Sequence, residues 1–267
     1  MIPNQPRSNV GMGLDPQKYE EYWLRGWTVV EGVFAAPEVD TIGQLAISLC
    51  EPEITSADSS YNADLSKDGR LAPRKLDNPF LKHRDLRNFV MDRRLRALVE
   101  ELIRRPPMLI NDQMFMKPPR FGSAKPYHQD NAYFLCHPDD EVITAWIALD
   151  DVDEFNGCLR YISGSHRGPI LEHLPIPGEP YNTTPATEQI DLTQEAPACV
   201  KKGGVVFHHS KTLHTSHRNE SDKWRRAYAS HWGSAAVTSE IDTIDGAYFN
   251  RSPELYKESL AGIAEPT

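Results

Sequence analysis

Two side chains that commonly bind metal ions stand two residues apart, at His128 and Asp130 in the segment Tyr127-His128-Gln129-Asp130. On an extended segment, residues at positions i and i+2 face the same side, so both groups can reach one ion. A second histidine from a distant strand would complete a two-histidine, one-carboxylate triad with open positions, which is typical of non-haem Fe(II) oxygenases. Zinc enzymes more often use three nitrogen or sulfur ligands. The tripeptide alone is a weak motif, because such a pair is more often a surface ion pair or a capped turn.

The third ligand has several candidates. Histidines cluster between residues 207 and 219, and others lie on either side of this cluster. The candidates are His166, His208, His209, His214, His217 and His231. Each of them is individually more often a core or surface histidine than a metal ligand. The residue types alone therefore leave the choice open.

The elements that must position these side chains begin with a helical region. Residues 37–49 have apolar residues at helical spacing and open with a proline suited to a first helical turn. We expect helices over residues 15–24, 37–49, 78–90 and 93–104, and an entry strand within residues 26–34. Residues 51–74 are polar and aperiodic, which predicts a long loop of the kind that often has a function.

From Pro107 onward the pattern changes to short β-rich runs separated by turn residues. The runs cover residues 108–110, 113–117, 142–149, 158–162, 205–208 and 226–232. Many short strands with proline and glycine between them indicate a sandwich or a barrel. Residues 173–199 contain five prolines and no period, so we expect an insertion over one mouth of the barrel. We predict one domain over residues 1–267, with a helical part at about 15–105 and a β core at about 107–235.

Further motifs follow the first in a fixed order. They are His128-Gln129-Asp130, Thr144-Ala145-Trp146-Ile147-Ala148-Leu149, Asn156-Gly157-Cys158-Leu159-Arg160-Tyr161-Ile162-Ser163-Gly164-Ser165-His166 and Leu213-His214-Thr215-Ser216, with an arginine after them. From about residue 20 to about residue 235, this series resembles the phytanoyl-CoA dioxygenase family of Fe(II)/2-oxoglutarate enzymes. The resemblance implies a mainly β fold with flanking helices and a double-stranded β-helix core, the cupin-like jelly roll.

The resemblance also assigns site residues. It places the distal iron ligand on His214 and the carboxylate anchor of 2-oxoglutarate on Arg225, eleven residues further on. A guanidinium suits this anchor because it is always charged and binds a carboxylate with two hydrogen bonds. Arg225 and Arg226 should face opposite sides of their strand, so only one of them can enter the barrel. Around the co-substrate the resemblance places Trp146, Gln113, Lys75 and Ser216.

The implied activity uses Fe(II), with 2-oxoglutarate and O2 as co-substrates. We expect an enzyme that hydroxylates an unactivated C–H bond of a small, polar or anionic metabolite and releases succinate and CO2. The substrate loops would be residues 51–74, 118–127 and 173–200, which carry Arg70, Arg74, Arg120 and Lys125 and few large apolar residues. The alternatives are a fatty acyl-CoA hydroxylase of the same family and a non-catalytic barrel that binds a metal and 2-oxoglutarate. For Arg160 the choice is between a surface charge and a pocket group, and for Tyr133 between a pocket wall and packing.

Composition narrows the partners of this chain. The net charge is -9, from 29 Lys and Arg against 38 Asp and Glu, which disfavours nucleic acid and anionic membranes. The sequence has no apolar stretch long enough to span a bilayer and no apolar signal core at its N-terminus. The four cysteines are widely spaced, which argues against a zinc ribbon or a disulfide framework. We therefore expect a cytoplasmic monomer or homodimer that acts on a small molecule.

Overall fold

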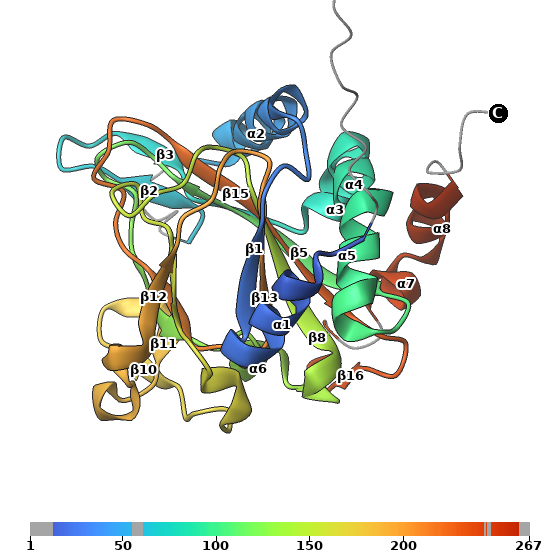
Figure 1. Cartoon of the computed structure of the whole chain (residues 1–267). Helices are drawn as coiled ribbons and strands as arrows, with labels where there is room; N and C mark the ends of the chain where they lie inside the picture. The colour runs from blue at the N-terminus through green and yellow to red at the C-terminus, as the bar shows by residue number, and fades with distance from the viewer. Residues whose placement is uncertain (1–12, 55–60, 243, 245–246, 262–267) are drawn as a thin grey trace, which may run out of the picture.

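Two antiparallel β-sheets form the centre of the computed structural model, which describes residues 13–54, 61–242, 244 and 247–261. The larger sheet has the strand order β1 (Trp27–Val30), β13 (Val205–His209), β8 (Val142–Ala148), β15 (Arg225–Gly233), β5 (Met108–Lys117) and β4 (Lys75–Asp77). The smaller sheet has the order β12 (Glu195–Ala198), β9 (Leu159–Ile162), β14 (His214–Ser216) and β6 (Lys125–His128). Neighbouring strands in both sheets come from distant parts of the chain, and Figure 1 shows the two sheets on either side of a common interior.

Three two-stranded sheets extend this framework. They are β2 (Ala63–Leu65) with β3 (Leu71–Pro73), β7 (Cys136–His137) with β16 (Thr238–Ser239), and β10 (Leu174–Ile176) with β11 (Glu179–Thr184). Short 3-10 turns occupy Glu51–Glu53, Asp139–Glu141, Ser165–Arg167, Thr187–Gln189 and Leu192–Gln194. Much of this additional structure therefore lies in the segments predicted as loops.

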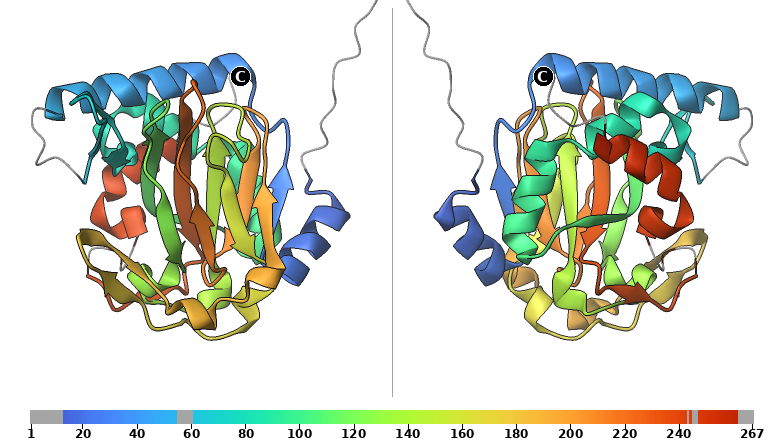
Figure 2. Two further views of the ribbon diagram at one scale, coloured as in Figure 1. Left: turned by 90° about the vertical axis from the view of Figure 1, so that its left-hand side faces the viewer. Right: turned by 90° about the vertical axis from the view of Figure 1, so that its right-hand side faces the viewer.

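The helices cover one face of the larger sheet and one of its ends. They are α1 (Pro16–Arg25), α2 (Ala36–Cys50), α3 (Pro79–Lys82), α4 (Arg84–Val90), α5 (Arg93–Ile103), α6 (Asn131–Phe134), α7 (Ala247–Arg251) and α8 (Pro253–Ala261). Figure 2 shows α2 lying across the end of the strands, with α4, α5, α7 and α8 on the outer face of the larger sheet. None of the helices in the described ranges is both long and apolar enough to cross a membrane.

Strand β8 explains how one sheet serves both a core and a site. Its residues Ile143, Ala145 and Ile147 are buried in the apolar core that also contains the helices. The alternate residues Thr144 and Trp146 point the other way and line a cavity between the sheets. This is the period-two alternation expected of a strand. Burial of one face thus holds the polar groups of the other face in place.

Several predicted elements changed their extent. The long loop at residues 51–74 contains the β2–β3 hairpin, and its residues 55–60 lie outside the described part. The predicted helix at 78–90 is divided into α3 and α4 because His83 has an extended backbone (φ -150°, ψ 141°). The runs at 108–110 and 113–117 are one strand, β5. The insertion at 173–199 supplies the β10–β11 hairpin and an edge strand, β12, which pairs with β9.

Candidate metal and co-substrate site

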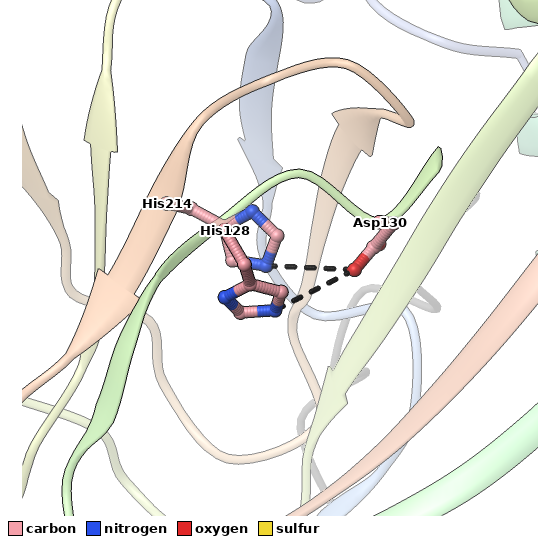
Figure 3. Close-up of side chains that lie close together, drawn as sticks. All are labelled: His128, Asp130 and His214. Atoms are coloured by element: carbon pink, nitrogen blue, oxygen red, sulfur yellow. Dashed lines mark ion pairs between the residues drawn. The ribbon is translucent and has the colours of Figure 1, made fainter. Parts of the chain in front are cut away.

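His128, Asp130 and His214 converge at the inner surface of the smaller sheet. His128 ends β6 and His214 begins β14, and the two residues are direct partners in the antiparallel pairing. The Nε2 atoms of His128 and His214 each lie 3.7 Å from Oδ1 of Asp130, as Figure 3 shows. One ligand atom from each of the three residues lies within 4.8 Å of the other two, close enough to be bound by one ion. All three residues are buried.

The protonation of this triad fits a metal site. Nδ1–H of His128 donates to the carbonyl of Pro126, and Nδ1–H of His214 donates to that of Thr212, both over 2.9 Å. These bonds leave the Nε2 lone pairs free for a metal. Burial lowers the pKa of His214 to about 4 and holds the pKa of His128 well below its usual value, so both rings are neutral at pH 7. The donor set therefore fits an Fe(II) ion.

A hydrogen-bond network fixes the second carboxylate oxygen of Asp130. Oδ2 accepts from the hydroxyl of Thr144 over 2.6 Å and from Nε2–H of His208 over 2.9 Å. Nδ1 of His208 then accepts from the Tyr161 hydroxyl, and Nδ1–H of His231 donates to the Thr144 oxygen, both over 2.8 Å. Burial alone would raise the pKa of Asp130, but the hydrogen bond from His208 holds it well below its usual value. The network keeps Asp130 ionised and turned toward the two ligand histidines.

This network makes Thr144 a positioning residue that can be tested. Replacing Thr144 by valine removes the hydroxyl with little change of shape, so Asp130 loses one of its two donors. We expect Thr144→Val to weaken Fe(II) binding by about 10- to 100-fold, the usual effect of losing a group that orients a ligand. Thr144→Ser keeps the hydroxyl and should bind Fe(II) as the unaltered chain does. Calorimetric titration with Fe(II) in the absence of oxygen measures the affinity of each variant. Equal Fe(II) affinity of Thr144→Val and Thr144→Ser would contradict the role of Thr144.

All eight residues predicted for the site line a single cavity of about 270 Å³. They are His128, Asp130, His214, Arg225, Trp146, Gln113, Lys75 and Ser216. Tyr133 also lines this cavity, so it belongs to the pocket wall. The structure thus brings the predicted residues together, and their roles in binding stay predictions.

The competing histidines are placed differently. His208 and His231 line the cavity, but both face the second oxygen of Asp130 from the larger sheet. His209 points to the opposite side of its strand, where Nε2–H donates to Asp140 over 3.2 Å. The remaining two, His166 and His217, are not among the residues that line the cavity, and the side chain of His217 is exposed.

Arg225 and Trp146 lie together in the wall of the cavity. The Arg225 guanidinium is buried and lies 5.3 Å from the centre of the Trp146 ring. Its Nε has no hydrogen-bond partner among the described residues, and burial lowers its pKa to about 10. Arg226 faces away and binds Asp150 through two bonds of 2.9 and 2.7 Å, which places the two arginines on opposite faces as predicted. A buried guanidinium without a bonded carboxylate suits a carboxylate ligand.

Lys117 is a cavity residue that the sequence analysis missed. It pairs with Arg225 across β5 and β15, and its ammonium group donates to the carbonyls of Ser216 and His217. Burial, and then the charge of Arg225, holds the pKa of Lys117 well below its usual value. Its alternation with Gln113 within the predicted strand was the signal that could have found it. Thr144, two residues before Trp146, carries the same signal.

Arg160 does not line the cavity, so the hypothesis that it is a pocket group is wrong. Its guanidinium forms ion pairs with Glu154 at 2.6 Å and with Glu195 at 2.7 Å, outside the cavity. These two carboxylates offset the cost of partly burying the charge.

A jelly roll that holds a buried two-histidine, one-carboxylate triad has the architecture of non-haem iron oxygenases. The chain belongs to the phytanoyl-CoA dioxygenase family, whose model matches residues 22–227. The resemblance seen in the sequence is therefore confirmed, and the three expected ligand residues lie where they could hold one metal ion.

Similar proteins support the family and the fold. The chain is 33% identical over 149 residues to phytanoyl-CoA dioxygenase domain-containing protein 1 of Bos taurus, covering 54% of this chain and 51% of the relative. It is 29% identical over 218 residues to a probable alpha-ketoglutarate-dependent hypophosphite dioxygenase of Stutzerimonas stutzeri, covering 79% of this chain and 75% of the relative. The chain thus spans about half the length of the bovine relative that it matches.

The solved structures confirm the predicted jelly-roll fold. A non-haem alpha-ketoglutarate-dependent carbocyclase from nogalamycin biosynthesis superimposes with a TM-score of 0.69 at 23% identity, over 89% of this chain and 90% of that chain. The protein EvdO2 of Micromonospora carbonacea var. aurantiaca, crystallised with 2-oxoglutarate, superimposes with a TM-score of 0.67 at 22% identity, over 86% and 94% of the two chains.

Proposed function

We propose that this chain is an Fe(II)- and 2-oxoglutarate-dependent dioxygenase that hydroxylates a C–H bond of a small polar or anionic metabolite, with release of succinate and CO2. The observation that carries this proposal is the presence, in one cavity, of the His128–Asp130–His214 triad and the buried Arg225 guanidinium. A structural metal site would need the triad but not the arginine. Family membership supports the same reaction class.

The residues of the chain divide the work as follows. His128, Asp130 and His214 would hold Fe(II), and Arg225 would bind the far carboxylate of 2-oxoglutarate. The iron and 2-oxoglutarate together supply the oxidising chemistry when O2 is present. Trp146 is buried and packs against Arg225. The protein thus contributes binding, orientation and a shielded site.

The size of the cavity favours a small substrate. Its volume of about 270 Å³ lies just below the usual range for ligand pockets, roughly 300 to 1,000 Å³, and 2-oxoglutarate must share it. Two rings that line it, Tyr61 and Tyr181, meet edge to face with centres 4.8 Å apart. A long acyl chain would need more room than this, which disfavours the fatty acyl-CoA alternative. The relative named for hypophosphite, a small oxyanion, supports the same preference.

The test is oxygen-dependent turnover of 2-oxoglutarate by the purified chain. With Fe(II) and no added substrate, we expect slow formation of succinate that requires oxygen. Small metabolites, both anionic and neutral, are then added one at a time, and we expect a subset to increase oxygen consumption and to be recovered with one additional oxygen atom. Absence of succinate with and without every metabolite, from protein that binds Fe(II) and 2-oxoglutarate, would favour the non-catalytic barrel instead.

A further inference from the structure

The cavity of this acidic protein is lined by cationic side chains. They are Arg74, Lys75, Lys117, Lys125 and Arg225. Among the described residues that line the cavity, Asp130 supplies the one carboxylate, and the proposed iron would use it. The far carboxylate of 2-oxoglutarate needs one anchor, Arg225, and the cavity holds more basic side chains than that. The remaining cations therefore require a separate explanation.

The cations lie in two groups within the cavity. Arg225 and Lys117 are cross-strand partners in the larger sheet, on β15 and β5. Lys125 begins β6 of the smaller sheet, three residues before His128, and its backbone pairs with that of Ser216. The position of Lys125 puts it beside the triad but on the opposite sheet from Arg225. Arg74 and Lys75 complete this second group: Lys75 begins β4 at the edge of the larger sheet, and the charges of both residues act on Lys125.

Within this second group, Lys125 differs from its neighbours in its bonding. Lys75 forms an ion pair with Asp77 at 2.9 Å, and Arg74 lies 4.0 Å from Asp64. Lys125 donates to the amide oxygen of Asn182 over 2.7 Å, and no carboxylate of the described residues forms an ion pair with it. An ammonium group has three donors, and Asn182 accepts from one of them. Lys125 is thus a half-buried cation whose charge no bonded anion of the described residues balances.

Asn182 holds Lys125 in a defined orientation. The side chain of Asn182 is itself buried, and its amide nitrogen donates to Glu179 over 2.8 Å, which sets the direction of the amide oxygen. Lys125 also lies over the Tyr133 ring, 5.3 Å from its centre. Burial, and then the charges of Arg74 and Lys75, lower the pKa of Lys125 to about 8, while Asp130 and Glu179 act to raise it. The ammonium group is therefore mostly protonated at pH 7.

We propose that Lys125, oriented by Asn182, binds an oxyanion group of the primary substrate, a carboxylate or a phosphonate, in a subsite separate from that of 2-oxoglutarate. The inference rests on the proposed function, because it assigns the substrate of that same site. An anion bonded to Lys125 would balance a half-buried charge, which makes the contact favourable. It would also hold the substrate beside His128, on the side of the cavity opposite the co-substrate anchor.

The experiment measures anion binding without turnover. Protein loaded with Fe(II) and 2-oxoglutarate is titrated calorimetrically in the absence of oxygen, once with methylphosphonate and once with propionate. We expect at least one probe to bind, and Lys125→Met to weaken that binding by on the order of tenfold to a hundredfold, the usual effect of losing a charged hydrogen bond. The affinity for 2-oxoglutarate should stay the same. The probe that binds more tightly tells the phosphonate class from the carboxylate class.

Two further variants complete the design. Lys202→Met makes the same chemical change at a lysine outside the cavity, where it pairs with Asp40, and should leave probe binding unchanged. Asn182→Ala keeps the lysine but removes the group that orients it, and should weaken probe binding to a lesser degree than Lys125→Met. It also serves if Lys125→Met fails to fold, since unchanged probe binding by Asn182→Ala would then overturn the proposal.

The outcomes separate this inference from the proposed function. The subsite would be overturned, even if succinate is formed, by either of two results. One is probe binding that is the same in Lys125→Met as in the unaltered chain, and the other is a loss of 2-oxoglutarate affinity in Lys125→Met as large as the loss of probe affinity. Failure of both probes to bind the unaltered chain would also overturn it. Lys125-dependent probe binding without any oxygen-dependent succinate would support the subsite and refute the dioxygenase activity.

Discussion

Replacing His214 by alanine is expected to abolish Fe(II) binding and oxygen-dependent succinate formation, with a loss of activity greater than about a hundredfold. The loss should exceed the 10- to 100-fold typical of groups that only orient a ligand, because a ligand itself is removed. His214 is buried, and its Nε2 lies 3.7 Å from Oδ1 of Asp130, so the alanine variant would keep only two of the three ligands. Calorimetric titration without oxygen measures the Fe(II) affinity, and the succinate formed per minute measures turnover.

His217→Ala provides the matched control for this prediction. His217 lies three residues further along the chain with an exposed side chain outside the cavity, and its carbonyl rather than its ring contacts Lys117. We expect its alanine variant to bind Fe(II) and to form succinate as the unaltered chain does. Equal Fe(II) affinity of His214→Ala and His217→Ala would refute the triad as the iron site.

The second large effect is expected at Arg225. Replacing Arg225 by methionine should raise the Kd of 2-oxoglutarate by roughly a hundredfold or more, as the loss of one partner of a buried charge pair does. The Kd of the Arg225→Lys variant should fall between those of the unaltered chain and Arg225→Met, because an ammonium group keeps the charge but cannot form the same pair of parallel hydrogen bonds. The Fe(II) affinity should not change, since Arg225 makes no contact with the triad. Calorimetric titration of the Fe(II)-loaded protein with 2-oxoglutarate measures both variants.

Arg226→Met is the control at the neighbouring position. Arg226 bonds Asp150 on the other face of the strand, so its loss should lower stability but leave the Kd of 2-oxoglutarate unchanged. Arg225→Met should have the opposite pattern. It removes a buried charge that has no bonded anion, so the protein without 2-oxoglutarate should melt at a higher temperature. If the two variants raised the Kd equally, Arg225 would not be the anchor.

Local sequence patterns predicted several elements of this fold. The helical spacing at residues 37–49 corresponds to α2, and the β-rich run at 142–149 corresponds to β8. Both have strong periods that tertiary contacts reinforce rather than oppose. The break between α3 and α4 was not visible in the sequence. His83, the residue between the two helices, has an extended backbone although it is neither a proline nor a glycine. The short strands β6 and β14 were missed for a similar reason, since their pairing partners lie far away in the chain.

The candidate ligands were predicted through motif order, and strand geometry explains why residue type alone could not choose among them. His208 and His214 are both buried and both lie close to Asp130. The difference is the sheet from which each one comes. His214 reaches Oδ1 from the same sheet as His128, whereas His208 donates to Oδ2 from the opposite sheet. The separation of six residues between His208 and His214 does not indicate which oxygen of Asp130 each imidazole will approach.

By itself the sequence indicated the family, because its motifs follow one another in a fixed order along the chain, and it predicted opposite faces for Arg225 and Arg226, because parity is a property of a single strand. Only the tertiary structure decided the electrostatics of the cavity. A net charge of -9 gives no sign of a cationic interior, since net charge sums over the whole surface. Antiparallel pairing brought Lys117 beside Arg225, and the β11 hairpin brought Asn182 to Lys125. Charges from distant segments act on one another only after the fold has brought them within a few ångströms.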